Sequence, residues 1–325
     1  MTVEKIDNIA LPAKADVTLK LCGNVAEIKY VQHTNSKPRI EKIDKDNYVV
    51  LGTGEVREFQ HTESRKDDLQ SVKESLGRLR DYLNTNVVNV KYCRFLTLTY
   101  RDEMTDPARL YRDYKAFNRK CRKMYGHYEY IVAAEVQRPR TPGGSGVLHL
   151  HCVLIFKGKA PFMDNKTVAG LWGQGFVNIR AVRNVADVGR YLTAYLTDIP
   201  LEDVGKMPAD LKPGQLKNVK ATVDGVEVEK SIIKGYRLKY LPPGFNLYRV
   251  SSKIKPPSIS RITGTEADSL LQDWKLTYQS TYRITDESRD FDNIVSTLYF
   301  NKLLGQKEKA MLEKARQEMK ERDKK

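Results

Sequence analysis

The chain has 325 residues, a length that allows one large domain or two modest ones. Hydrophobic residues make up 40% of it and charged residues 30%, a composition that excludes intrinsic disorder. No apolar run approaches the roughly 18 residues of a membrane span, and the first residues lack a secretory pattern. The four cysteines form no CxxC pair, which argues against a zinc site or a disulfide framework. We therefore expect no membrane association and a reducing cytoplasm.

The net charge of +15 is unevenly distributed along the sequence. Residues 1–90 and residues 262–325 each hold equal numbers of basic and acidic side chains, so the whole excess lies between residues 91 and 261. A basic middle flanked by neutral ends favours a polyanionic partner such as nucleic acid. The alternative is a basic protein with no nucleic-acid partner, which charge alone does not exclude.

The order of the predicted elements indicates the fold class. Short β-like pieces fill the first 60 residues, and leucines spaced by three and four predict an amphipathic helix from about residue 69. Beyond it we predict a strand at 93–100, a helix at 107–125, strands at 128–137 and 147–156, a short helix at 167–172, a strand at 175–183 and a helix at about 185–196. This is the ferredoxin-like or RRM-like α+β order, in which an antiparallel sheet carries helices on one side.

The chain is predicted to comprise four segments. Residues 1–90 form a β-rich N-terminal cap with the amphipathic helix, 91–204 the core, 205–300 a basic extension rich in proline and lysine, and 301–325 a charged helical tail. The basic and aromatic side chains expected to contact DNA are Arg190, Arg237, Lys239, Tyr240, Tyr248, Arg249, Lys253 and Lys255, with Tyr236 and Phe245 as further stacking candidates. Packing of the extension against the sheet explains the aromatic members equally well.

The strand HLHCVLIF carries the clearest chemical signal. Alternation along a strand places His149 and His151 on one face, about 7 Å apart at the backbone, within reach of one metal ion. Glu135, on the preceding strand, adds a carboxylate, and two imidazoles with one carboxylate suit a divalent metal with open coordination positions. The alternative is a pair of hydrogen-bonded core histidines.

Two tyrosines in VADVGRYLTAYLTD form a second candidate group. Tyr191 and Tyr195 are four residues apart on a predicted helix, so their hydroxyls project from one face. Tyrosines at this spacing usually serve packing. A phenol, with an ordinary pKa of about 10, attacks a phosphate only when that phosphate is polarised, and a nearby metal ion would supply the polarisation.

Three motifs in this order resemble those of the HUH single-strand endonucleases, and within them the rolling-circle replication initiators (Rep) of bacterial plasmids, integrative elements and phages. They are FLTLTY (95–100), HLHCVLIF (149–156) and YLTAY (191–195), with WGQGFVNIRAV (172–182) between the last two. The resemblance implies that residues 91–204 are the HUH nuclease core, with histidines on a central strand. It also implies a metal held by His149, His151 and Glu135, nicking by a tyrosine, and a bacterial cytoplasmic protein.

The tyrosine motif departs from the family in two ways. Many relatives carry a lysine three residues after the first tyrosine, where this chain has Ala194. One-tyrosine initiators have an acidic residue four positions before the nucleophile, and two-tyrosine initiators use both phenols; this chain has Asp187 and also both tyrosines. We expect Tyr191 to be the first nucleophile, with Asp187 as its partner and Tyr195 as a second nucleophile or DNA contact.

The reaction implied is a metal-dependent strand transfer. A tyrosine would nick one strand at an origin, become linked to the 5′ phosphate, free a 3′-OH primer and later rejoin the strand. We expect Mg or Mn as the cofactor and no nucleotide cofactor for this transesterification. No P-loop motif is present, so unwinding would need a separate helicase. The expected partners are single-stranded or extruded hairpin origin DNA and a host helicase and DNA polymerase, and self-association at the origin is left open.

Other interpretations remain from the sequence. One is a relaxase- or transposase-like HUH nickase, and another is a metal-dependent hydrolase that uses water. A third is a non-catalytic protein on an RRM-like fold that binds single-stranded nucleic acid. The last leaves the histidine pair without a role, and FLTLTY is not the aromatic-rich strand motif of RNA-binding proteins on this fold.

Overall fold

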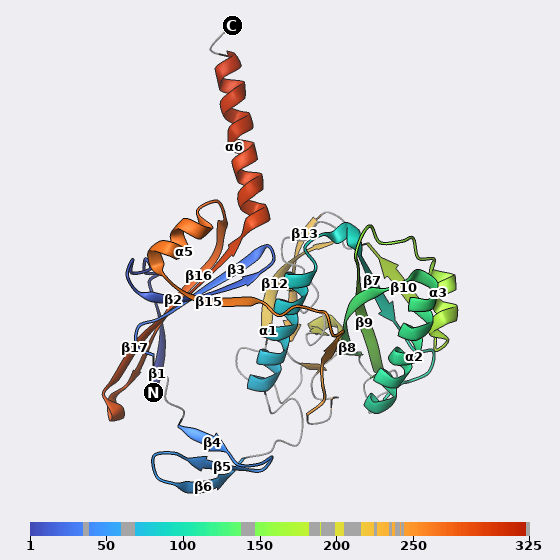
Figure 1. Ribbon diagram of the computed structural model, residues 1–325, viewed down its shortest axis with the longest axis horizontal. Helices are drawn as coiled ribbons and strands as arrows, with labels where there is room; N and C mark the ends of the chain where they lie inside the picture. Colours follow the sequence, from blue (N-terminus) through green and yellow to red (C-terminus); the bar gives the residue numbers. More distant parts are fainter. Residues whose placement is uncertain are drawn as a thin grey trace. The chain divides into compact units, whose positions relative to one another are not determined.

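The computed structural model describes residues 1–34, 39–59, 69–137, 147–181, 189, 199–204, 216–223, 226–233, 236–237, 241 and 244–322. It confirms the predicted α+β class (Figure 1). The chain divides into two compact units: unit 1 is Met1–Thr62 together with Pro257–Lys325, and unit 2 is Glu63–Pro256. No helix in the described ranges has the length and apolarity needed to cross a membrane. All four cysteines are free and buried.

Unit 2 is built on a five-stranded antiparallel sheet in the order β10-β7-β9-β8-β14. Its strands are β7 (Cys93–Leu98), β8 (Tyr128–Gln137), β9 (Val147–Phe156), β10 (Val177–Arg180) and β14 (Tyr248–Val250). Strand β9 lies at the centre, between β7 and β8, and is buried along most of its length. The predicted bounds of β8 and β9 are confirmed. Both strands carry long apolar stretches rich in β-branched residues, which made them predictable from the sequence.

Helices cover both faces of this sheet. α2 (Pro107–Tyr125) and α3 (Asn165–Trp172) lie on one face, where Leu110, Phe117 and Trp172 join one core cluster (Figure 1). The bounds of α2 follow from local signals: Asp106 caps its first turn, Pro107 opens it, and Gly126 ends it with a positive φ of 82°. The prediction of helices on one side is confirmed for α2 and α3.

The opposite face is covered by α1 (Leu69–Asn86), which was predicted to belong to the N-terminal cap. Leu79 and Leu83 of α1 pack against Ile131 of β8 and Val153 of β9 in a second core cluster. Apolar residues at these spacings form one stripe on a helix, and that stripe needs a buried surface. The sheet of unit 2 supplies it, so the helix belongs to unit 2.

Unit 1 is built on a six-stranded antiparallel sheet in the order β1-β16-β17-β3-β2-β15. Its strands are β1 (Thr2–Ile6), β2 (Asp16–Cys22), β3 (Val25–Val31), β15 (Ser258–Thr263), β16 (Lys275–Asp286) and β17 (Phe291–Asn301). α5 (Gly264–Leu271) packs on one face of this sheet, and α6 (Lys302–Arg322) follows β17. A small separate sheet contains β4 (Ile40–Lys42), β5 (Asn47–Val50) and β6 (Glu55–Glu58).

The division into units differs from the four predicted segments. Strand β3, near the start of the chain, pairs with β17, and β2 pairs with β15, so residues from 1–90 and 205–300 share one sheet. The first part of the predicted basic extension contains a hairpin of β12 (Leu216–Val223) and β13 (Val226–Ile233), for which no strands were predicted. β11 (Ile199–Pro200) pairs with β13 at the edge of this hairpin. Strands that pair across a long stretch of sequence show no local sequence pattern that identifies their partners. This is why the observed units differ from the predicted segments.

Candidate functional site

The predicted histidine pair lies on the central strand of the unit 2 sheet. In the strand register Glu135 of β8 stands directly opposite His149 of β9, and Thr97 of β7 stands opposite His151. Residues directly opposite each other in an antiparallel pair share a face, so the two histidines and the carboxylate lie on one side. This is the side that α1 covers further along the sheet.

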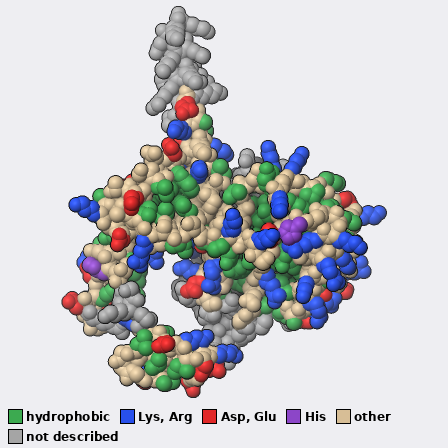
Figure 2. Space-filling view, viewed as in Figure 1, with side chains coloured by type: hydrophobic (Ala, Val, Ile, Leu, Met, Phe, Trp, Pro, Cys, Tyr) green, Lys and Arg blue, Asp and Glu red, His purple; other side chains and the backbone are tan. Residues whose placement is uncertain are grey.

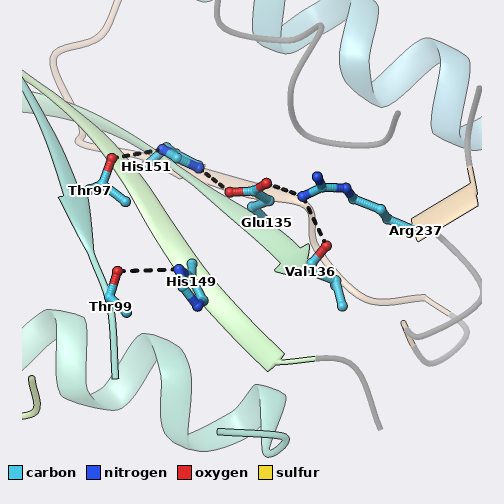
Figure 3. Close-up of polar contacts among 7 residues, drawn as sticks. All are labelled: Thr97, Thr99, Glu135, Val136, His149, His151 and Arg237. Carbon is cyan, nitrogen blue, oxygen red and sulfur yellow. Dashed lines mark hydrogen bonds and ion pairs between the residues drawn. The ribbon is translucent and has the colours of Figure 1, made fainter. Parts of the chain in front are cut away.

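Each histidine ring is held from β7 through its Nδ1 atom. Thr97 Oγ1 lies 3.2 Å from His151 Nδ1, and Thr99 Oγ1 lies 3.2 Å from His149 Nδ1 (Figure 3). The His151 ring also stacks on Phe95, with ring centroids 5.6 Å apart and an interplanar angle of 2°. Both rings are therefore held in orientation through Nδ1, and His151 directs its Nε2 atom to Glu135.

Glu135 joins His151 to a cation from a distant part of the chain. Its carboxylate accepts a hydrogen bond from His151 Nε2 and another from Arg237 Nη1 (Figure 3). Arg237 Nη1 also lies 3.3 Å from the carbonyl oxygen of Val136. Glu135 is only 6% exposed and His149 5%. Arg237 was predicted to contact DNA, and the structure places it against the carboxylate.

The charge state of Glu135 follows from these contacts. Burial raises the pKa of its carboxyl group, but the hydrogen bond from His151 and the positive charges of His151, Arg237 and His149 together lower it below the ordinary value. The carboxylate is thus ionised at neutral pH. A buried anion of this kind is tolerated because it has charged and hydrogen-bonded partners.

The donor set suits a divalent metal in its chemistry. Imidazole nitrogens and a carboxylate are ligands for Mn²⁺ and related ions, and the three side chains lie on one face. Within the described ranges, no three His, Cys, Asp or Glu side chains are already grouped around a common point. To bind a metal, His151 and Glu135 would exchange their mutual hydrogen bond for coordination. As they stand, the histidines are also hydrogen-bonded in the way that the core-histidine alternative requires.

The predicted tyrosine group lies outside the described residues. This applies to Asp187, Arg190, Tyr191 and Tyr195, and also to Ala194 and to the DNA-binding candidates Lys239 and Tyr240. Gly189, two residues before Tyr191, is described and buried.

Gly189 is held closely against α1. Its backbone N–H donates a hydrogen bond of 2.8 Å to the side-chain oxygen of the buried Asn84. A Cβ atom at Gly189 would lie 2.5 Å from the backbone oxygen of Arg80, closer than real contacts allow, so only glycine fits here. The sequence analysis did not predict that Asn84 and Arg80 contact the chain at Gly189. The signal that could have indicated a close backbone contact is the glycine itself, two residues before Tyr191.

α1 therefore connects the two candidate groups. Leu79 and Leu83 line a small cavity together with His151 and Phe95, while Arg80 and Asn84 on the same helix hold Gly189. One rigid helix thus contacts the histidine strand and the segment that leads to Tyr191.

The remaining DNA-binding candidates occupy mixed environments. Tyr248 is partly buried beside Tyr82, with ring centroids 6.1 Å apart, and burial raises its pKa. Phe245 is buried and stacks on Tyr111. The exposed Arg249 places its guanidinium 4.1 Å from the centre of the Tyr111 ring. Lys253 and Lys255 are exposed. The described aromatic candidates thus contribute to packing, and the basic ones lie at the surface.

A further basic surface lies on α2. The exposed side of this helix carries Arg109, Arg112, Lys115, Arg119, Lys120 and Lys123. Figure 2 shows Lys and Arg side chains gathered over the part of unit 2 where α2 and α3 lie. Such a cluster is an electrostatic footprint for a polyanion.

Comparison with known proteins adds one finding. Residues 93–199 match the model of the replication-associated protein ORF2 family. The matched range includes β7, β8, β9 and β10 with both histidines, and it extends past both tyrosines. It covers about a third of the chain. No curated protein and no solved structure gives a significant match.

Proposed function

We propose that this protein is a rolling-circle replication initiator that nicks one strand of origin DNA with a tyrosine nucleophile. The observation that carries the proposal is the joint position of His149, His151 and Glu135 on one face of a sheet whose strands match a replication-associated family. The partners proposed are origin DNA, a host helicase and a host DNA polymerase, in a bacterial cytoplasm.

His149, His151 and Glu135 would hold Mg²⁺ or Mn²⁺, which neutralises charge on the scissile phosphate and orients it for attack. Thr97 and Thr99 contact the Nδ1 atoms, so the Nε2 atoms would be the ones to bind the metal. Arg237 would be displaced from Glu135 when the carboxylate becomes a ligand, and its guanidinium could then bind a phosphate oxygen.

The nucleophile proposed is the phenol oxygen of Tyr191. It forms a bond to phosphorus while the bond from phosphorus to the 3′ oxygen breaks. The phenol gives up its proton and the leaving 3′ oxygen gains one, so the strand ends in a free 3′-OH and the enzyme carries the 5′ phosphate. The hold of α1 on Gly189 supports this role, because it fixes the chain two residues before Tyr191.

The test is a search for the covalent intermediate. Full-length protein is incubated with Mn²⁺ and single-stranded fragments that cover the DNA of the element that encodes it, and the products are measured by intact mass spectrometry. We expect a protein-oligonucleotide adduct that chelator prevents. Strand cleavage without an adduct would instead indicate a hydrolase that uses water, and binding without cleavage would indicate the non-catalytic alternative.

A further inference from the structure

The sheet of unit 1 has two chemically different faces. On one face, buried aliphatic side chains such as Val17, Leu19 and Ile28 pack beneath Ala267 and Leu271 of α5. The strand register assigns the alternate residues of every strand to the opposite face. We call that opposite face the open face.

Tyrosines lie along the open face on the two long strands β16 and β17. Tyr278 stands opposite Tyr299, with ring centroids 6.1 Å apart, and Tyr282 lies four residues further along β16. Four residues of strand span about 13 Å, which is room for more than one base. Tyr278 is 50% exposed and Tyr282 36%. Large aromatic rings left this exposed on a sheet indicate a surface that binds something.

Basic side chains lie on the same face of the sheet as these rings. Lys5 stands opposite Tyr282, Lys29 opposite Thr297, and Arg261 opposite Thr18, and all three cations are exposed. In the described part of the chain, none of these three takes part in an ion pair.

Acidic side chains on the open face are few. Glu27 is neutralised by Lys20 at 2.5 Å, Asp16 lies at the edge beside β15, and Asp286 lies at the far end of β16, where it accepts a hydrogen bond from Ser288. The open face therefore combines accessible aromatic rings with a positive charge. These two features act on different parts of the same ligand, the bases and the phosphates of a single strand.

We propose that the open face of unit 1 binds single-stranded DNA. Base stacking needs unpaired bases, so the exposed tyrosines favour a single strand over a duplex. Lys5, Lys29 and Arg261, on the same face as the rings, would bind the phosphates. The choice of DNA over RNA rests on the proposed nicking function, which produces a DNA strand, but binding to the open face does not require that chemistry.

The decisive test locates the strand on the protein. Full-length protein in chelator, so that no nicking occurs, is irradiated with oligothymidine that contains 5-iododeoxyuridine, and the cross-linked peptides are mapped. We expect cross-links at Tyr278, Tyr282 or Tyr299 that excess duplex DNA does not remove. Cross-links confined to residues 63–256 would overturn the proposal. Equal or better cross-linking by the matching RNA would overturn the choice of DNA.

Variants then separate stacking from charge. Tyr278→Ala with Tyr282→Ala should abolish the cross-links to unit 1, whereas the matched Tyr278→Phe with Tyr282→Phe keeps them, because phenylalanine also stacks. Leu270→Ala, an exposed change on α5, controls for surface effects. Lys5→Gln, Lys29→Gln and Arg261→Gln together should reduce the salt dependence of cross-linking at unit 1 by about two in slope. If the alanine variants dissociate an oligomer and leave the cross-links unchanged, the open face is a self-association surface instead.

Discussion

Asn84 on α1 accepts a hydrogen bond of 2.8 Å from the backbone N–H of Gly189, two residues before Tyr191. The same helix lines a small cavity beside His151 with Leu79 and Leu83. One helix, which precedes both in the sequence, thus packs against the histidine strand and holds Gly189. Variants of α1 and Gly189 test this relationship directly.

Gly189→Ala should slow adduct formation at least tenfold under single-turnover conditions, because its Cβ would push the tyrosine segment away from the backbone of Arg80. The affinity for DNA should stay within about twofold, since phosphate contacts dominate it. Gly77→Ala is the matched control on α1, where an added Cβ meets nothing within 4 Å. It should keep full activity and gain about 0.4–1 kcal/mol of stability.

Hydrogen exchange of the Gly189 N–H tests its hydrogen bond to Asn84 independently of nicking activity. With glycine labelled in its amide, Asn84→Leu should remove the protection of the Gly189 N–H that wild type shows. Unchanged protection would mean that the hydrogen bond does not hold this segment, whatever the activity of the variant.

His149→Ala or His151→Ala should reduce nicking at least 100-fold and leave most DNA binding intact, because the imidazoles serve the chemical step. His127→Ala is the matched control, since His127 is exposed and pairs with Glu129 away from the site. Gel-based nicking with Mn²⁺ measures the first effect and fluorescence anisotropy the second. Full nicking by the double histidine variant in chelator would refute the metal assignment.

Arg237→Met should lower the free energy of unfolding by about 3 kcal/mol, because it leaves the buried carboxylate of Glu135 with one cation fewer. The pKa of Glu135 should then rise, since Arg237 is among the charges that lower it. The loss of unfolding free energy in the variant should therefore become smaller as the pH falls through the raised pKa of Glu135, because the protonated carboxyl group no longer needs a cation. Denaturant titrations at several pH values measure this, and adding Glu135→Gln should recover most of the loss. A variant as stable as wild type at every pH would show that the ion pair carries no net stability.

The choice of tyrosine gives a separate prediction. If Tyr191 and Asp187 act as a one-tyrosine pair, Tyr191→Phe removes the adduct, Tyr195→Phe keeps it, and Asp187→Ala impairs termination more than initiation. If both phenols alternate, each single variant still forms some adduct and only the double variant is inactive. Peptide mapping of the adduct decides between them, and a phosphotyrosine found only at Tyr195 would reverse the assignment.

The basic side of α2 should contribute to DNA affinity without sequence preference. Replacing Arg112, Lys115 and Arg119 by glutamine should reduce the slope of log affinity against log salt for duplex DNA by up to about 2.7. The nicking rate at saturating DNA should not change, because α2 lies on the face of the sheet opposite the histidines. An unchanged salt slope would show that α2 does not contact DNA.

Much of unit 2 follows from local patterns in the sequence. The apolar runs of β8 and β9, and the Asp106, Pro107 and Gly126 signals around α2, predict those elements at the observed bounds. The shared face of His149, His151 and Glu135 follows from strand alternation once the two strands are paired.

The other relationships depend on tertiary contacts. Arg237 meets Glu135 across 102 positions of sequence, and the fit of Gly189 on Arg80 requires the two backbones to be brought together first. The β12–β13 hairpin, with lysine and glutamate along it, has no long apolar run to reveal it. No sequence pattern states which strands of unit 1 will be neighbours.

The placement of β16 and β17 has a consequence for synthesis. These strands separate β1 from β3 in the unit 1 sheet, yet they are made after the whole of unit 2. On the ribosome, residues 63–256 have their own core and can fold before β15 and β17, the later partners of β2 and β3, have been synthesised. A nascent chain would thus complete the proposed nicking unit before the open face exists. A nonsense codon ahead of residue 275 would therefore leave unit 2 without the open face and its tyrosines.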